Sequence, residues 1–168
     1  MGTRLLSESL VRARFPHLRY IRIHTSSRHA ATIYAWNDQL QLPDADQADL
    51  RRFAADYLVP YVCFKIKAYS MIQEEEVPPA GALPECVERA AMSRSLDLPG
   101  IIGVLNGMFA EGEIVFERYD QAAGMVYLSV HTQAVVTEIE RELLRRYLYE
   151  LLPLGTNFEV AYDLVLNE

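Results

Sequence analysis

The chain has 168 residues, of which 51% are apolar and 23% charged, a composition typical of a globular domain rather than a disordered chain. Its net charge of −7 argues against non-specific binding to nucleic acid or to an anionic membrane, because like charges repel. The sequence lacks the run of roughly 18 apolar residues that a membrane helix needs, and Cys63 and Cys86 lack the spacing of a metal site or a disulfide framework. We therefore expect a soluble, cytoplasmic protein with no membrane contact, no metal and no cofactor.

The charge is distributed unevenly along the chain. Residues 1–36 contain six arginines and one acidic residue, Glu8, a local charge of +5, so the rest of the chain carries −12. These arginines are Arg4, Arg12, Arg14, Arg19, Arg22 and Arg28. We interpret four of them as a candidate protein-interaction surface, because opposite charges steer partners together. The four are Arg12, Arg14, Arg19 and Arg22. The alternative interpretation is that the arginines are solvated or pair with the acidic part of the same molecule.

The first half of the chain predicts a helix, a hairpin, a second helix and a strand. Ser7 is the expected N-cap of the first helix, which ends before Pro16. The polar link 25–28 predicts a hairpin turn. The expected elements are the helix Ser7–Phe15, the strands Leu18–His24 and His29–Trp36, a short strand at Leu40 and Leu42, the helix Asp46–Val59 and the strand Val62–Ala68.

The second half begins after residues 73–82, where three consecutive glutamates and two prolines predict an exposed connection. We expect a short helix, then a three-stranded meander that leads into a long helix. Thr132 is the expected N-cap of the long helix, and Pro153 and Gly155 end it before a final strand. The expected elements are the helix Pro84–Arg94, the strands Ile101–Phe109, Glu113–Tyr119 and Met125–Val130, the helix Gln133–Leu151 and the strand Phe158–Leu166.

The long helix has the clearest periodicity in the sequence. Its apolar residues recur at intervals of three and four and form one broad face, which must be buried. That face comprises Val136, Ile139, Leu143, Leu144, Tyr147, Leu148 and Leu151. We expect Leu143 and Leu148 to be buried against the sheet.

These patterns predict the α+β class. We expect a single domain, residues 1–168, in which the helices Asp46–Val59 and Gln133–Leu151 pack on a largely antiparallel sheet. The halves 16–72 and 98–168 each contain strands, then a helix that ends in Leu and Pro, then a strand. This similarity has two interpretations: an internal duplication of a ββαβ unit, joined by the exposed connection 73–82, or the common arrangement of α+β proteins.

One polar cluster is a candidate ligand site. It comprises His24, Ser26, Arg28 and His29, in or beside the link of the predicted hairpin. These side chains provide hydrogen-bond donors that can hold a phosphate or orient a partner. The alternative interpretation is an ordinary polar hairpin loop.

Other residues with suggestive spacing have simpler interpretations. The carboxylates of Asp44, Asp46 and Asp49 lack the glycine and the further ligands of a calcium loop, so we interpret them as charges at a helix N-terminus. The glycines at 100, 103 and 107 do not fit a dinucleotide loop and predict a bulge or a close backbone approach in a strand. We therefore assign no catalytic, cofactor-binding or metal-ligating residue.

The segment Val126–Val160 consists of a predicted strand, a predicted helix and then the sequence Leu-Pro-Leu-Gly. It is similar to parts of the contractile-tail baseplate proteins of phages. The resemblance implies a structural component of a larger assembly.

Three functions are compatible with these observations. The first is a non-enzymatic subunit that acts through protein contacts, with a partner or with itself, in an oligomer or larger assembly. The strands nearest the chain ends favour this function because their free edges offer another chain a place to pair. The second is a small-ligand-binding protein or enzyme with a dispersed site near His24 and His29. The third is a nucleic-acid accessory factor that uses the arginine-rich N-terminal region, with Tyr20, Tyr34 and Trp36 for stacking. We prefer the first, because no set of residues forms a catalytic signature and the net charge disfavours nucleic acid.

Overall fold

The computed structural model describes residues 2–60, 62–68, 81–109 and 112–165. The chain divides into two compact units. The N-terminal unit contains Gly2–Ala82 together with Pro153–Gly155, and the C-terminal unit contains Leu83–Leu152 and Thr156–Glu168. The predicted α+β class is confirmed, because helices accompany a three-stranded mixed sheet in each unit. Within the described residues, no helix is long and apolar enough to span a membrane.

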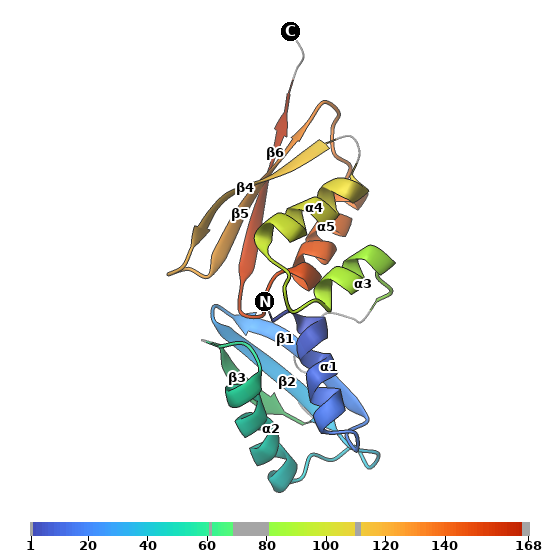
Figure 1. The fold of residues 1–168 in the computed structure, drawn as a ribbon, viewed down its shortest axis with the longest axis vertical. Coiled ribbons are helices and arrows are strands. Elements are labelled where there is room, and N and C mark those ends of the chain that lie inside the picture. The colour runs from blue at the N-terminus through green and yellow to red at the C-terminus, as the bar shows by residue number, and fades with distance from the viewer. Residues whose placement is uncertain (1, 61, 69–80, 110–111, 166–168) are drawn as a thin grey trace. The chain divides into compact units, whose positions relative to one another are not determined.

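The N-terminal unit is a three-stranded sheet, sheet A, with two helices (Figure 1). Its elements are α1 (Arg4–Arg14), β1 (Tyr20–Ser27), β2 (Ala30–Trp36), α2 (Asp44–Tyr57) and β3 (Cys63–Lys67). The hairpin β1–β2 is antiparallel, whereas β3 pairs in parallel with β2. The parallel pairing follows from α2, which carries the chain back to the end of the sheet where β2 began.

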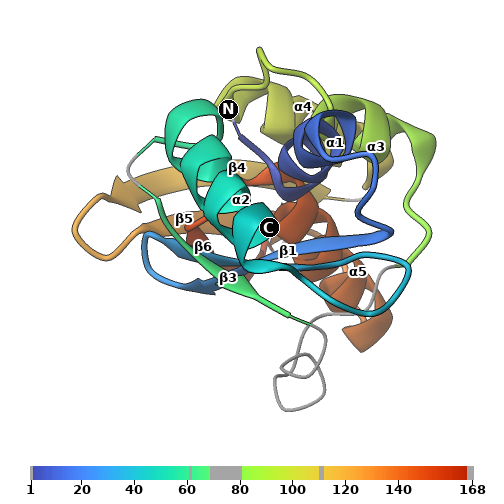
Figure 2. The same ribbon diagram turned by 90° about the horizontal axis from the view of Figure 1, so that it is seen from below.

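Figures 1 and 2 show α1 and α2 on the same face of sheet A. The core of this unit lies between the helices and the strands. It contains Val11 and Phe15 at α1, Ile21, Ile23, Ala31, Ile33, Ala35 and Ile66 on the strands, Leu50 and Ala54 on α2, and also Leu18 and Leu154. These strand residues alternate along β1 and β2 and face the helices. The opposite face of β2 is buried as well, since Thr32, Tyr34 and Trp36 are at most 8% exposed.

Two details of this unit differ from the sequence prediction. The N-cap of α1 is Thr3, whose hydroxyl accepts from the Leu6 N–H, and Ser7 lies buried inside the helix. No strand forms at Leu40, because Leu40 sits at a positive φ of 58° in a turn in which the Asn37 N–H donates to the Gln41 carbonyl. That conformation is incompatible with a strand.

The C-terminal unit is built around a second three-stranded sheet, sheet B (Figure 1). Its elements are α3 (Glu85–Ala91), α4 (Leu98–Met108), β4 (Gly112–Asp120), β5 (Met125–Thr132), α5 (Glu138–Leu151) and β6 (Asn157–Leu164). The hairpin β4–β5 is antiparallel, and β6 pairs in parallel with β5 across the crossover helix α5. Each unit therefore has the same order of hairpin, helix and parallel third strand.

The predicted strand Ile101–Phe109 is wrong, since this stretch belongs to helix α4. Asp97 is the N-cap and accepts from the Gly100 N–H, and a proline occupies the first turn, as is common in helices. Ile101 and Leu105, four residues apart, are the buried positions. The predicted three-stranded meander is accordingly a two-stranded hairpin.

The long helix is shorter at its N-terminus than predicted. Thr137 is the N-cap rather than Thr132, and it forms a capping box with Glu140. The buried face is centred on Leu144, Tyr147, Leu148 and Leu151. The predicted burial of Leu148 is confirmed, whereas Leu143 is half-buried and Ile139 is exposed. The helix begins at Glu138, so Ile139 lies in its first turn and on the side away from the buried face.

Residues 69–80, which include most of the predicted connection 73–82, lie outside the described residues. Sheet A and sheet B share the ββαβ order that the two predicted halves suggested. The single domain spanning 1–168 and the internal duplication stay predictions.

Candidate functional site

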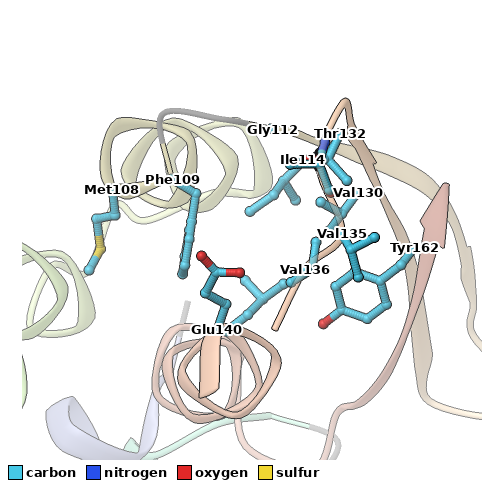
Figure 3. A pocket seen from close by; sticks show the side chains of 12 residues that line it. Met108, Phe109, Gly112, Ile114, Val130, Thr132, Val135, Val136, Glu140 and Tyr162 are labelled. Carbon is cyan, nitrogen blue, oxygen red and sulfur yellow. Dashed lines mark hydrogen bonds between the residues drawn. The ribbon is translucent and has the colours of Figure 1, made fainter. Parts of the chain in front are cut away.

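The C-terminal unit contains an apolar cavity of about 160 Å³ between α4, α5 and the end of sheet B (Figure 3). Five segments line it: the end of α4, β4, β5 with the loop after it, α5 and β6. The lining residues are Met108, Phe109, Gly112, Ile114, Val130, Thr132, Ala134, Val135, Val136, Glu140, Leu144 and Tyr162. A cavity of this size and character can hold one benzene-sized apolar group.

The cavity offers few polar groups. Figure 3 shows Phe109, Ile114 and Val136 directed into it, with the Glu140 carboxylate between the Phe109 and Val136 side chains. That carboxylate accepts from the Thr137 N–H at 2.8 Å and so completes the capping box of α5. The Tyr162 ring forms one wall and packs under the Arg141 guanidinium, which lies 4.3 Å from the ring centroid. The chemistry of this cavity therefore favours an apolar occupant.

Apolar side chains remain exposed at the same end of sheet B. Val135 is 78% exposed, Leu164 49% and Val165 45%. They gather there because Thr132, which lines the cavity, pairs with Leu164 and accepts from the Val165 N–H at 2.8 Å. We call these three residues the apolar rim. A group of exposed apolar side chains near one end of a sheet marks a binding site more often than isolated exposed residues do.

Beside the rim, β6 is an edge strand with a free side. Asn157 and Val165 donate their N–H groups toward β5, to the carbonyls of Gly124 and Thr132, each at 2.8 Å. Backbone groups alternate in direction along a strand, so those of residues 158, 160, 162 and 164 point toward the outer edge. None of the described residues forms a hydrogen bond with these outward groups.

Comparison of this chain with protein-family models, with known proteins and with solved structures finds no match. The assignment of function therefore depends on the geometry of the chain itself.

The edge of β1 differs from that of β6, because α1 blocks it. The Glu8 carboxylate accepts from the Ile23 N–H at 2.9 Å, and the Arg12 guanidinium donates to the Ile21 carbonyl at 3.1 Å. A bulge between Thr25 and Ser27 also interrupts the register of this strand. Occupied backbone groups and bulges prevent a further strand from pairing.

The edge of β4 is blocked in a similar way. The Asn106 side chain, on α4, accepts from the Ile114 N–H at 2.7 Å and donates to the Ile114 carbonyl at 3.2 Å. A bulge between Phe116 and Arg118 shifts the register farther along the strand. The remaining edge, β3, is only five residues long and carries Lys65 and Lys67. Short strands and lysines are common protections of sheet edges. Within the described residues, β6 is the long edge that has neither a bulge nor a side chain bound to its outward backbone groups; its exposed charges are the carboxylates of Glu159 and Asp163.

The face of sheet B away from the helices carries a polar row. Ser129 donates its hydroxyl hydrogen to the Glu117 carboxylate, and its oxygen lies 3.2 Å from His131 Nε2. His131 Nδ1 lies 3.8 Å from Asp163 Oδ2. These are the residue types of a hydrolytic triad, but a nucleophilic serine must give its proton to the histidine. Ser129 gives its proton to Glu117 instead and is only 3% exposed, so the row is a structural network.

The arginines of the predicted interaction surface lie in different environments. Arg22 is buried, and its guanidinium lies 3.9 Å from Glu8, which Arg4 also contacts, at 2.7 Å. Arg12 lies 3.6 Å from the same carboxylate and remains partly exposed. Three arginines of the basic region thus contact one carboxylate, Glu8, which belongs to the same region. The alternative interpretation expected such pairs with the acidic part of the chain instead.

Arg14 and Arg19, like Arg12, are exposed. Arg14 lies over the Phe15 ring at 5.9 Å, and Arg19 pairs with Asp38 on the surface. A surface pair of this kind contributes little to stability, typically ~0 to 1 kcal/mol, so it can exchange for a partner's carboxylate.

The candidate ligand cluster around the hairpin has a clear structural role. His29 adopts a positive φ of 53° at the turn; its N–H donates to the Gly155 carbonyl, and its carbonyl accepts from the Cys63 N–H at 2.8 Å. Thr25 accepts from the Gly155 N–H at 3.1 Å. The hairpin therefore anchors both β3 and the segment after α5.

His24 lies within β1 and is half-buried, whereas Ser26, at the bulge of β1, and Arg28, in the turn, are exposed. Burial lowers the pKa of His24, and the positive charges of Arg22 and Arg4 lower it further. This environment favours the neutral imidazole, which is a poor partner for an anionic phosphate. The role of this cluster as a ligand site stays a prediction.

The aspartates and glycines with suggestive spacing have structural roles or lie in a helix. Asp44 and Asp46 lie in the first turn of α2, and Asp46 contacts His17 at 2.8 Å. Over the described part of the chain, no cluster of three His, Cys, Asp or Glu side chains could hold a metal ion. Gly100, Gly103 and Gly107 lie in α4, so the predicted bulge or close backbone approach in a strand is wrong. A methyl group added at Gly103 or Gly107 would meet nothing within 4 Å, whereas one at Gly100 would lie 3.0 Å from the Asp97 side chain.

The aromatic residues proposed for base stacking lie together on one face of sheet A. Tyr20 is stacked on Trp36, with 3.8 Å between ring centroids. Trp36 is 8% exposed and Tyr34 is 1% exposed, so neither presents an open face to a base. This arrangement does not favour the stacking platform that binding of single-stranded nucleic acid requires.

The sequence predicted open edges on the strands nearest both chain ends. The edge of β6 is open, whereas α1 blocks that of β1, and the cavity was not predicted. Two of its walls come from Met108 and Phe109 at the end of α4, which the sequence pattern placed in a strand. The signal that identifies α4 is Asp97 followed by a proline two residues later, with apolar residues four apart at Ile101 and Leu105.

Proposed function

We propose that this protein is a non-enzymatic subunit that acts through protein contacts, and that the apolar end of the C-terminal unit forms one such contact. The observation that supports this proposal is the apolar cavity with its exposed rim of Val135, Leu164 and Val165. Exposed apolar area is unfavourable in water by about 25 cal/mol per Å², so covering the rim favours association. A side chain that enters the cavity would serve as the anchor that dominates such contacts.

The resemblance of Val126–Val160 to parts of phage baseplate proteins is compatible with this proposal. That segment contains β5, α5 and the beginning of β6, and so supplies Val130, Thr132 and Leu144 of the cavity wall. We therefore propose a structural component of a larger assembly as the specific form of the function.

The N-terminal arginines supply a second element of the proposal. The exposed Arg14 and Arg19 belong to a region of charge +5 in a chain of net charge −7, so an acidic surface of a partner or of a second copy suits them. Arg12 keeps part of its side chain exposed and can contribute, whereas Arg22 already lies inside the unit.

The test compares the assembly of the native chain with that of two variants, in extract from the cells that produce it. We expect the native chain to sediment well above its 19.2 kDa mass. The change Val135→Glu places a charge on the rim and should return the chain to its own mass. Tyr57→Glu, in the N-terminal unit, is the matched control, since Tyr57 is 69% exposed against 78% for Val135, and it should leave the assembly intact.

A photo-crosslinking residue at position 135 then identifies what covers the rim. We expect one predominant adduct, with a single partner protein or with a second copy, and no adduct from position 57. A native chain that sediments at 19.2 kDa at every concentration and in extract would contradict the proposed function.

A further inference from the structure

We propose that the outer edge of β6 accepts an extended segment of another protein as a fourth strand of sheet B, and that this segment alternates apolar and basic residues. The inference deepens the proposed function and rests on it, because it specifies the chemistry of the partner at the apolar end of the C-terminal unit.

The outer edge of β6 has backbone groups that can pair with an added strand. Its outward N–H and C=O groups at residues 158, 160, 162 and 164 have no hydrogen-bond partner among the described residues. The register of β6 with β5 is regular over all eight residues, whereas β1 and β4 contain bulges. In β1 and β4, outward backbone groups also form hydrogen bonds with the side chains of Glu8, Arg12 and Asn106. Proteins protect edges that must not pair, often with bulges or with charged side chains. β6 has no bulge, and its exposed charges, Glu159 and Asp163, disfavour an acidic strand but not a basic one. Strand addition at an exposed edge is a common mode of peptide recognition.

The side chains of β6 determine what the added strand must carry. On the helix side, the residues are apolar: Phe158, Val160, Tyr162 and Leu164. On the other side, Glu159 and Asp163 are exposed, with Ala161 between them. Neighbouring strands place their side chains in line on each face, and opposite charges in such cross-strand pairs are favourable. A partner strand therefore needs apolar residues on the helix side and lysine or arginine on the side of Glu159 and Asp163.

A second copy of this chain is a poor occupant of the edge. Antiparallel pairing of β6 with itself uses all of the outward amides only when the pairing is centred on Ala161. That register places Glu159 directly opposite the other copy's Asp163, twice in each dimer, and like charges in this position are destabilising. The net charge of −7 on each chain adds to the repulsion. The charge pattern favours a different, basic segment.

The first experiment measures amide hydrogen exchange along β6 in the full chain. In the free protein, the amides of residues 159, 161 and 163 should exchange slowly because they face β5, while those of 158, 160, 162 and 164 should exchange quickly. The probes are two eight-residue peptides, (Val-Lys)₄ and (Val-Glu)₄. Binding slows exchange by the factor 1 + [L]/Kd, about tenfold at a peptide concentration ten times Kd. We expect the even-numbered amides to slow with (Val-Lys)₄ and to remain fast with (Val-Glu)₄.

Two variants separate the backbone edge from the side chains. Val160→Pro removes one outward N–H without touching the N–H groups that face β5, and proline is tolerated at such edge positions. Val160→Ala removes most of the same side chain and keeps the amide, so it is the matched control. We expect (Val-Lys)₄ to protect the edge of the alanine variant and not that of the proline variant. Thermal unfolding of both variants checks that they are folded.

A charge exchange keeps the inference testable if the proline variant does not fold. The double change Glu159→Lys and Asp163→Lys should reverse the preference, so that (Val-Glu)₄ protects the edge and (Val-Lys)₄ does not. Equal protection by both peptides, or by neither, would overturn the inference. Protection that rises with protein concentration, without peptide, would overturn it in favour of a second copy.

The assembly in cell extract distinguishes this inference from the proposed function. If Val135→Glu disrupts the assembly and Val160→Pro leaves it intact, the proposed function stands and strand addition is wrong. If neither variant changes a chain that is already monomeric, both are wrong. If Val160→Pro and Val135→Glu both disrupt it while Val160→Ala does not, both are supported.

Discussion

The protection of the β4 edge by Asn106 leads to a quantitative prediction. We expect Asn106→Leu to destabilise the C-terminal unit, because leucine keeps a similar volume but cannot satisfy the Ile114 backbone. The native side chain accepts from the Ile114 N–H at 2.7 Å and donates to its carbonyl at 3.2 Å. Ile114 is 2% exposed, so water cannot easily replace these bonds. Each buried group left without a partner costs ~1 to 3 kcal/mol, and Asn106 is itself half-buried, so we expect a total of ~2 to 4 kcal/mol.

Urea denaturation followed by circular dichroism measures this loss. For a small protein with a slope of ~1 to 3 kcal/mol per molar urea, the expected loss lowers the midpoint by about 1 M or more. Asn106→Asp is a second comparison. Aspartate keeps the acceptor for the Ile114 N–H, but it loses the donor and places a carboxylate oxygen against the Ile114 carbonyl, so this variant should also be less stable than the native chain. A leucine variant as stable as the native chain would refute the reasoning.

Three further predictions concern the two cores and pH. Leu148→Ala should destabilise the protein by ~2 to 5 kcal/mol through lost transfer energy and a residual cavity, because Leu148 is fully buried. An unchanged urea midpoint would contradict this prediction. Gly155→Ala should destabilise the protein by ~1 to 2 kcal/mol or more. Gly155 has a φ of +78°, and its added methyl group would lie 3.2 Å from His29 Cα. Thermal unfolding measures this loss of stability, and a stabilised variant would show the reasoning to be wrong. The pKa of His24 lies below its ordinary value of 6.5, so the unfolded chain binds a proton more readily than the folded chain. The contribution of His24 to the free energy of unfolding is therefore fully present above about pH 6.5 and is lost as the pH falls below that value. His24→Gln should flatten this part of the plot of unfolding free energy against pH.

The elements whose periodicity is strong could be predicted from the sequence. The β1–β2 hairpin, α2, β3, α3, α5 and β6 lie close to their predicted positions, because each combines a clear apolar spacing with a capping residue or a proline at its end. The buried position of Leu148 follows from the same pattern. Leu143 and Ile139 show the limit of this reasoning: a broad apolar stripe predicts which side of a helix is buried but not where the burial stops.

The failure at α4 has a different cause. An apolar run with three glycines fits a buried strand and a buried helix equally well by composition. The Asp97 cap and the proline in the first turn select the helix, and the tertiary structure then buries Ile101 and Leu105. That choice also determines the cavity, because the end of α4 supplies two of its walls.

The sequence by itself determined the α+β class, the principal helices and the apolar side of each strand, because these depend on spacing within one segment. Only the tertiary structure decided how strands pair and which backbone groups remain free. Contacts between different elements decide this: β6 pairs in parallel with β5, and the Asn106 side chain binds the backbone of β4. Glu8 and Arg12 bind the backbone of β1 in the same way. A hydrogen bond across elements depends on the three-dimensional positions of both partners, and no local pattern records it. The open edge and the apolar cavity are consequences of those long-range contacts, and they are the features on which the proposed function rests.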